Sequence, residues 1–281
     1  MPVNDYCERV VRDTDKDRFL ATLFAPASLR PALFALYAFD SEVASTADRV
    51  SQPLAGEVRL QWWHDILVAD EFGGAAGSPV ASALIAALLD FGLPRQPLID
   101  LIKARRFDLY QDNIATLAEL ELYGEQTAGA IFYLAARISF GGDDPHLKEV
   151  ARHAGIASTV IRRLSAFGVH AARGRLFVPT ELFQRHGAWP EDLFARNVTP
   201  QWREALAELR GHARGHLNTA RELIATIPQN ARVAFLPAAL LRPVLARMEN
   251  SDYDPLAPVN FAQWRKQLIL WRAARDLASW L

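Results

Sequence analysis

The chain has 281 residues, of which 51% are hydrophobic and 22% are charged, as is ordinary for a globular protein. Its 31 basic and 32 acidic residues give a formal net charge of -1. That balance argues against nucleic acid as a partner, because nucleic-acid-binding domains usually carry a basic excess. No apolar run is long enough to suggest a membrane span, and the single cysteine, Cys7, excludes an intrachain disulfide.

The first 19 residues, MPVNDYCERVVRDTDKDRF, carry charges of both signs. A secretory signal requires an apolar core, and a transit peptide avoids acidic residues. We therefore expect a cytoplasmic protein.

Apolar residues recur at three- and four-residue steps through most of the chain, which predicts helices. In chain order, the expected helices are 3–14, 16–24, 30–48, 54–72, 78–91, 97–111, 116–139, 144–170, 179–186, 189–196, 200–226, 232–249 and 261–280. Glycine pairs and steps such as Ser78-Pro79 separate them, and no long flexible linker interrupts the series. We therefore expect one all-α domain that spans residues 1–281.

Two of the long predicted helices contain residues that disfavour a regular helix. Gly129 lies inside 116–139, and Pro237 and Pro243 lie inside 232–249. A helical glycine often marks close packing or a bend, and an interior proline removes a backbone hydrogen bond. Bent helices around a cavity and tight helix packing explain these residues equally well.

An acidic cluster on helix 30–48 is the first candidate site. Asp40 and Asp48 are separated by just over two helical turns, so both can point the same way, and Glu42 lies between them. Carboxylates on facing helices can hold a metal or a magnesium-bound diphosphate. Because Val43, Ala44, Ser45, Thr46 and Ala47 supply no further carboxylate, we favour a solvated or ion-paired face over a metal site.

Four arginines form the second candidate site: Arg162, Arg163, Arg173 and Arg175 lie at the end of helix 144–170 and in the following turn. Guanidinium groups gathered at one helix end can clamp an anion. Ordinary surface ion pairing is the competing interpretation.

His212 and His216 lie four residues apart on helix 200–226, which is a metal-ligand spacing. The HExxH zinc signature requires a glutamate after the first histidine, and Ala213 occupies that position. We therefore interpret the two histidines as an ordinary pair and expect no metal.

Several segments resemble the signature segments of squalene and phytoene synthases. They are LRPALFALYAFDSEVASTADRV, RLQWWHDIL, RFDLYQDNIATLAELELYGEQTAGAIF and HAGIASTVIRRLSAFGVHAARGRLFVP, in the family's order. The resemblance implies the all-α isoprenoid synthase fold with a central cavity. We expect helices 30–48, 54–72, 116–139 and 150–170 to line that cavity.

The chain departs from this family at its two aspartate-rich motifs, which hold magnesium against the substrate diphosphates. The paired aspartates of the first motif fall on Ala44 and Ser45, and only Asp48 remains. Those of the second motif fall on Ala166 and His170. We therefore expect no metal, no cofactor and no catalytic residue. The candidate cavity or ligand-binding residues are Asp40, Glu42, Asp48, Asp108, Tyr123, Gly129, Arg163, Arg173 and Arg175.

The chain is similar to the assembly factor 6 branch of this family, which has the same losses. Two further segments carry this similarity: DYCERVVRDTDKDRFLATLFAPASLRPALFALYAFDSEVAS and FLPAALLRPVLARMENSDYDPL. That branch supports early assembly of respiratory NADH–ubiquinone oxidoreductase (complex I). The resemblance implies a complex I subunit or assembly intermediate as partner, peripheral contact with the inner membrane and, in the cavity, a prenyl-like lipid. The alternative is a prenyl transferase that condenses two prenyl diphosphates with Mg2+.

The C-terminal helix 261–280 is the candidate for membrane contact. Its tryptophans alternate with arginine and lysine, a composition typical of an interfacial amphipathic helix. The competing interpretation is a closing core helix whose tryptophans pack on the bundle.

Overall fold

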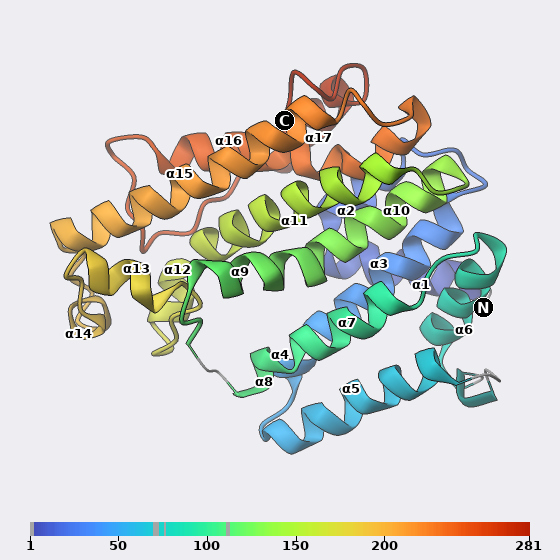
Figure 1. Ribbon diagram of the computed structural model, residues 1–281, viewed down its shortest axis with the longest axis horizontal. Coiled ribbons are helices and arrows are strands. Elements are labelled where there is room, and N and C mark those ends of the chain that lie inside the picture. The colour runs from blue at the N-terminus through green and yellow to red at the C-terminus, as the bar shows by residue number, and fades with distance from the viewer. Residues whose placement is uncertain (1–2, 70–72, 76, 111–112) are drawn as a thin grey trace.

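The computed structural model describes residues 3–69, 73–75, 77–110 and 113–281. Throughout these ranges the regular structure is helical and no β-strand is present (Figure 1). The predicted all-α class is therefore confirmed.

The main α-helices are α1 (Val3–Thr14), α2 (Lys16–Thr22), α3 (Arg30–Ala44), α5 (Pro53–Val68), α6 (Pro79–Asp90), α7 (Gln96–Arg105), α9 (Leu117–Gly124), α10 (Ala130–Phe140), α11 (Pro145–Ser165), α15 (Pro200–Leu223), α16 (Leu241–Met248) and α17 (Gln263–Ala273). Short α-helices connect them: α4 (Thr46–Arg49), α8 (Phe107–Tyr110), α12 (Phe167–Ala171), α13 (Thr180–Arg185) and α14 (Pro190–Phe194). The remaining helical segments are the 3-10 helices η1 (Gly73–Ala75) and η3 (Gln229–Leu240) and the π-helix η2 (Glu125–Gly129).

Side-chain caps explain why several helices begin where the sequence predicts. The side chains of Ser78, Asp144 and Thr199 each accept a hydrogen bond from a backbone N–H in the first turn of α6, α11 and α15. A proline follows each cap at the first helical position, where no backbone N–H is needed. Local chemistry therefore fixes these three starts.

Several predicted helices are longer than those observed. Helix 30–48 ends early because the Ser45 hydroxyl donates a 3.2 Å hydrogen bond to the Glu42 carbonyl and the chain restarts as α4. Helix 144–170 likewise divides into α11 and α12, and helix 232–249 becomes a 3-10 segment that contains Pro237, followed by α16. Residues 70–72 and 111, where two predicted helices were expected to end, lie outside the described residues.

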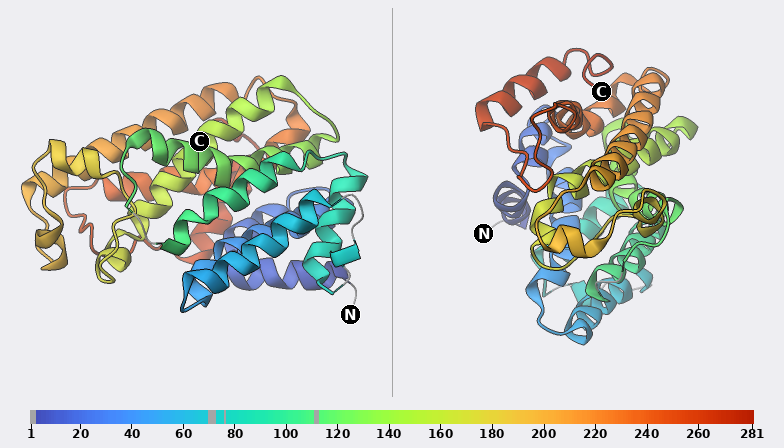
Figure 2. Two further views of the ribbon diagram at one scale, coloured as in Figure 1. Left: turned by 60° about the horizontal axis from the view of Figure 1, so that its bottom comes forward. Right: turned by 90° about the vertical axis from the view of Figure 1, so that its left-hand side faces the viewer.

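Two helices form the centre of the bundle. α3 packs against α1, α6 and α10, and α11 packs against α9, η2, α10 and α15. Figure 2 shows α5 on the opposite side of the molecule from α15. A continuous apolar core runs from Cys7 on α1 to the C-terminal Leu281.

Glycines allow α11 to approach the α9–η2 segment very closely. A Cβ atom placed on Gly155 would lie 2.3 Å from the backbone nitrogen of Gly129, and one on Gly124 would lie 2.9 Å from the Cα of Ile156. Between the two explanations left open for Gly129, the structure shows close packing, in a segment that has widened to a π-helix.

The C-terminal helix α17 packs on the bundle through its aliphatic side chains, whereas two of its tryptophans face outward. Ile269 and Leu270 are buried, and the helix packs on η3 and α2. Trp264 and Trp271 are 67% and 46% exposed on its outer side. Within the described ranges, every helix is too short or too polar to cross a membrane.

The glycine contact generates a stability prediction. Gly155→Ala should lower the free energy of unfolding by about 1–3 kcal/mol, because the added methyl group collides with the η2 backbone. Gly211→Ala, at an open position inside α15, should raise it by up to about 1 kcal/mol, because alanine favours helix. Urea denaturation measures both changes. Equal effects of the same sign would contradict this account of the packing.

Candidate functional site

A cavity of about 460 Å³ opens between the central helices. Its wall comes from the α1–α2 junction, α3 and α4, α7 and α8, α9 and η2, α11 and α12, and the turn at 172–177. Nine charged residues line it: Asp15, Arg18, Asp40, Asp48, Arg105, Asp108, Arg162, Arg163 and Arg175. The cavity is therefore highly charged, although the chain as a whole is nearly neutral.

Helix α5 was expected to line this cavity, and that prediction is wrong. No residue of α5 lies on the cavity wall. α5 packs on α4, α7 and α8, and α7 and α8 present Arg105 and Asp108 to the cavity in its place.

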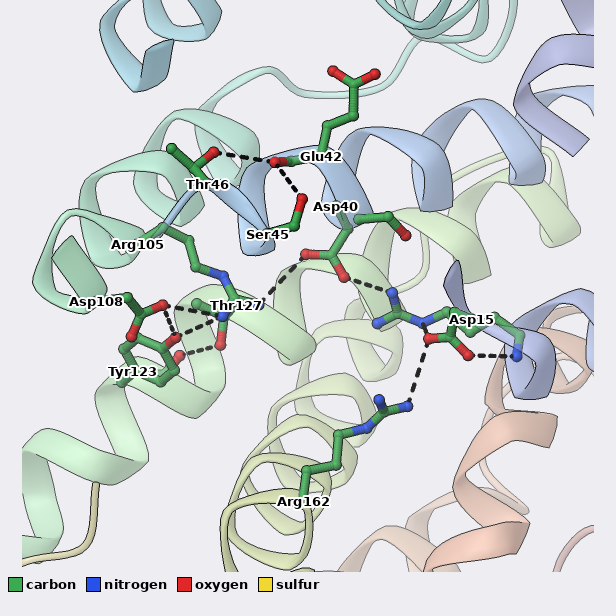
Figure 3. A network of polar contacts seen from close by, with 12 residues as sticks. Asp15, Asp40, Glu42, Ser45, Thr46, Arg105, Asp108, Tyr123, Thr127 and Arg162 are labelled. Carbon is green, nitrogen blue, oxygen red and sulfur yellow. Dashed lines mark hydrogen bonds and ion pairs between the residues drawn. The ribbon is translucent and has the colours of Figure 1, made fainter. Parts of the chain in front are cut away.

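Asp40, on α3, lies at the centre of the charged network (Figure 3). Its Oδ2 atom lies 2.5 Å from Nη1 of Arg18, and its Oδ1 atom lies 3.6 Å from Nη2 of Arg105. Only 8% of the Asp40 side chain is exposed. Burial alone would raise the pKa of Asp40, but the two guanidinium groups outweigh it and hold that pKa below its usual value. Asp40 is therefore an anion whose charge is already balanced.

A second group of contacts surrounds Asp108, on α8. The Tyr123 hydroxyl donates a 2.7 Å hydrogen bond to Asp108 Oδ2, and Arg105 donates to both the Tyr123 oxygen, at 2.7 Å, and the same carboxylate, at 3.2 Å. Arg163, on α11, lies 3.8 Å from Asp108 Oδ1 and places its guanidinium 4.5 Å from the centre of the Tyr123 ring. Burial, opposed by Arg105, raises the pKa of Tyr123 to about 12. Tyr123 thus stays protonated and hydrogen-bonded inside an ion-pair network.

The α1–α2 junction supplies the third pairing. Asp15 lies 3.8 Å from Arg18 and 3.7 Å from Arg162 on α11, and it also caps α2 by accepting from the backbone of Arg18 (Figure 3). One carboxylate thus connects the start of α2 with α11 across the cavity.

The remaining cavity charges are less constrained. Asp48, on α4, is exposed, and among the described residues neither Asp48 nor Arg175 has a side-chain ion pair or hydrogen bond. Burial, together with Arg163 and Arg173, lowers the pKa of His170, so its imidazole is neutral at pH 7. With five arginines against four aspartates, the described wall carries one net positive charge.

The comparisons with known proteins agree with this architecture. The family model for squalene/phytoene synthase matches residues 11–272. The chain belongs to the squalene/phytoene synthase family. It therefore shares the family's all-helical isoprenoid synthase fold.

Two relatives and one solved structure illustrate the range of this family. The chain is 30% identical to the human NADH dehydrogenase (ubiquinone) complex I, assembly factor 6, over 253 residues, covering 90% of this chain and 76% of the relative. It is 28% identical to the phytoene synthase of Arthrospira platensis over 284 residues, covering 95% and 90%. A dehydrosqualene synthase solved with a ligand superposes with a TM-score of 0.85 at 20% identity, covering 99% of this chain and 97% of that one.

The squalene/phytoene synthase fold implies magnesium ions in the cavity, and the residues present do not fit them. Mg2+ requires several free carboxylate oxygens in octahedral geometry. The carboxylates of Asp15, Asp40 and Asp108 each lie against two arginines, whose cations occupy the space and supply the charge that a metal would. Among the described residues of the wall, Asp48 is the one aspartate left without an arginine partner, and one carboxylate is too few.

The structure separates the residues that the sequence proposed for the cavity. Asp40, Asp48, Asp108, Tyr123, Arg163 and Arg175 lie on the cavity wall, and Glu42, Gly129 and Arg173 do not. Glu42 is two residues from Asp40, so it points away from Asp40 to the other side of α3 (Figure 3). There its carboxylate lies 3.2 Å from Arg59. Gly129 faces α11, and Arg173 is exposed on the turn after α12.

The sequence reasoning did not identify Asp15, Arg18 and Arg105 as cavity residues. Arg105 had a usable signal, because it lies three residues before Asp108 and such neighbours meet on one helical face. Arg18 had none, since it reaches Asp40 from 22 residues away through tertiary packing alone.

The buried ion pairs generate a stability prediction. Asp40→Asn keeps the shape of the side chain but leaves Arg18 and Arg105 with less compensation. The free energy of unfolding should fall by about 3 kcal/mol, the lower end of the range for removing one partner of a buried pair, because Asp15 and Asp108 remain.

Glu42→Gln is the matched control, since it removes a more exposed ion pair from the other side of α3. It should cost less than about 1 kcal/mol. Urea denaturation at pH 7 compares the two variants. If Asp40→Asn is no more costly than Glu42→Gln, the central network does not stabilise the fold as described.

Proposed function

We propose that this protein is a non-catalytic member of the squalene/phytoene synthase family that supports the assembly of respiratory NADH–ubiquinone oxidoreductase at the inner membrane. The observation that carries the proposal is the pairing of the cavity carboxylates, of which Asp40 is buried, with arginine. Ionisation of a prenyl diphosphate requires a metal or an equivalent charge that stabilises the leaving group. The described part of the cavity wall offers only Asp48 as an unpaired carboxylate, which is too few to hold the metal.

The relatives favour the assembly role over a catalytic one. At 30% identity over 90% of the chain, the human protein named as a complex I assembly factor is more similar to this sequence than the Arthrospira phytoene synthase. The likeness to the dehydrosqualene synthase structure supports the fold alone. A complex I subunit or an assembly intermediate is accordingly the partner we propose.

The cavity retains features that suit a bound anionic lipid of the prenyl class. Arg175 carries an uncompensated guanidinium, and Nδ1 of His170 is buried without a hydrogen-bond partner among the described residues. A buried polar atom without a partner is costly, so water or a ligand head group would stabilise it. The exposed Trp264 and Trp271 of α17 suit peripheral contact with the membrane surface that carries such lipids.

A strain that lacks the gene tests the assembly role. NADH–quinone activity of its membranes should fall, while succinate–quinone activity, which does not depend on complex I, stays unchanged. Reintroduced wild-type protein should restore the activity, and so should Asp48→Asn, which removes the last carboxylate of the first aspartate-rich motif at an exposed position. Unchanged NADH–quinone activity in the deletion strain would overturn the proposal.

The purified protein tests the non-catalytic part. Incubation with farnesyl or geranylgeranyl diphosphate and Mg2+ should yield no hydrocarbon or cyclopropyl product by mass spectrometry, because Ala44, Ser45, Ala166 and His170 replace the metal ligands. Production of squalene, phytoene or a presqualene-type diphosphate that Asp48→Asn abolishes would establish the prenyl transferase alternative.

A further inference from the structure

A cluster of two histidines and one glutamate lies outside the cavity, where α9 and α15 flank α11. Nε2 of His212 lies 2.8 Å from Oε1 of Glu121, and Nε2 of His216 lies 3.4 Å from the same oxygen. The three ligand atoms lie within 4.8 Å of one another. The three helices run side by side in Figure 1. None of these residues belongs to the cavity wall.

One polar atom of this cluster is buried without a hydrogen-bond partner among the described residues. Nε2 of His212 is buried and, within the described part of the chain, makes no hydrogen bond of acceptable geometry, despite its short distance from Glu121. Such an atom normally has a partner in the folded protein, so it points to a group not supplied by the chain.

The two distances from Glu121 to the histidines are close to those of a tetrahedral metal site. With metal–ligand bonds of about 2.0–2.1 Å, neighbouring ligand atoms in a tetrahedron lie about 3.3–3.4 Å apart. The Glu121–His216 distance already has this value, and the Glu121–His212 distance is shorter by about half an ångström, which a small side-chain rotation corrects. Because Glu121 comes from another helix, the i, i+4 histidine pair acquires a third ligand that the sequence pattern did not reveal.

A third histidine supports the pair from α11. Nδ1 of His153 lies 2.9 Å from Nδ1 of His216, so a proton between them orients the His216 ring and leaves its Nε2 facing Glu121. Ligating histidines usually make such an outer hydrogen bond. Arg152 donates a hydrogen bond to Nε2 of His153, at 3.0 Å, so the proton of a neutral His153 lies on its Nδ1. When a metal binds Nε2 of His216, the His216 proton lies on Nδ1 and is donated to Nδ1 of His153. The His153 proton then moves to Nε2, and Arg152 turns away.

We propose that Glu121, His212 and His216 form a site for one divalent transition-metal ion of the zinc class. Two imidazoles and one carboxylate are a ligand set that zinc uses when one coordination position stays open to water. The ion would join α9 to α15 across α11. Because Glu121 lies two residues before Tyr123, the site would hold in place the helix that presents Tyr123 to the cavity.

Cobalt provides the direct test, because Co2+ replaces Zn2+ and absorbs visible light according to its coordination geometry. The untagged full-length protein, stripped with a chelator, should bind one Co2+ per chain and develop the visible bands of a four- or five-coordinate ion. Zn2+ should displace the Co2+ and raise the midpoint of thermal unfolding, because it binds the folded state alone. Glu121→Gln, His212→Ala and His216→Ala should each abolish the bands.

Two further variants separate a metal site from a general effect on folding. His186→Ala should leave the bands unchanged, because His186 contacts Glu204 and Glu208 and does not belong to the Glu121–His212–His216 cluster. His153→Gln should weaken Co2+ binding roughly 10–100-fold, as expected for an outer-shell partner, in a chain whose circular dichroism matches the wild type. No bands with Co2+ in excess, or bands that persist in folded His212→Ala and His216→Ala proteins, would overturn the proposal.

Discussion

The pairing of buried carboxylates with arginines is the constraint on which the rest of this structure depends. Asp40 lies in the C-terminal half of α3, and its two partners come from α2 and α7. A buried charge is costly unless it is paired, so the pairing of Asp40 with Arg18 and Arg105 favours this arrangement of α2, α3 and α7. Arg105 then extends the network to Asp108 and Tyr123, and Arg163 connects it to α11. The shape of the cavity follows from this network.

The same network changes what the cavity can do. A magnesium ion can leave together with a diphosphate, and the protein needs unpaired carboxylate oxygens to bind that ion. A guanidinium fixed to a carboxylate provides positive charge that stays with the protein. The proposed non-catalytic role keeps the fold of a prenyl transferase without its metal chemistry, and the positive charge of Arg175, unpaired among the described residues, suits binding of an anion. The assembly role proposed for the chain requires the shape of the fold and a binding surface, and neither depends on turnover.

Sequence reasoning predicted the helical class and most helix positions, because apolar periodicity and capping residues such as Asp144 act locally. It also located Asp40 from the acidic spacing on helix 30–48, and Asp108 and Tyr123 through the resemblance to a known family. It could not pair Asp40 with Arg18, or His216 with Glu121. These contacts join segments 22 and 95 residues apart and leave no local pattern in the sequence. The absence of α5 from the cavity wall has the same cause, since it depends on how α7 and α8 pack between α5 and the cavity.

The effect of magnesium on diphosphate binding tests the central claim most directly. Isothermal titration of the purified protein with farnesyl diphosphate, once in EDTA and once in excess Mg2+, compares the two conditions on one sample. If arginines have taken the place of the metal, Mg2+ does not strengthen binding, because the complexed diphosphate carries less negative charge toward the guanidinium groups. Binding that is at least about tenfold tighter in Mg2+, equivalent to roughly 1.4 kcal/mol, would show a functional metal site in the cavity and contradict the account.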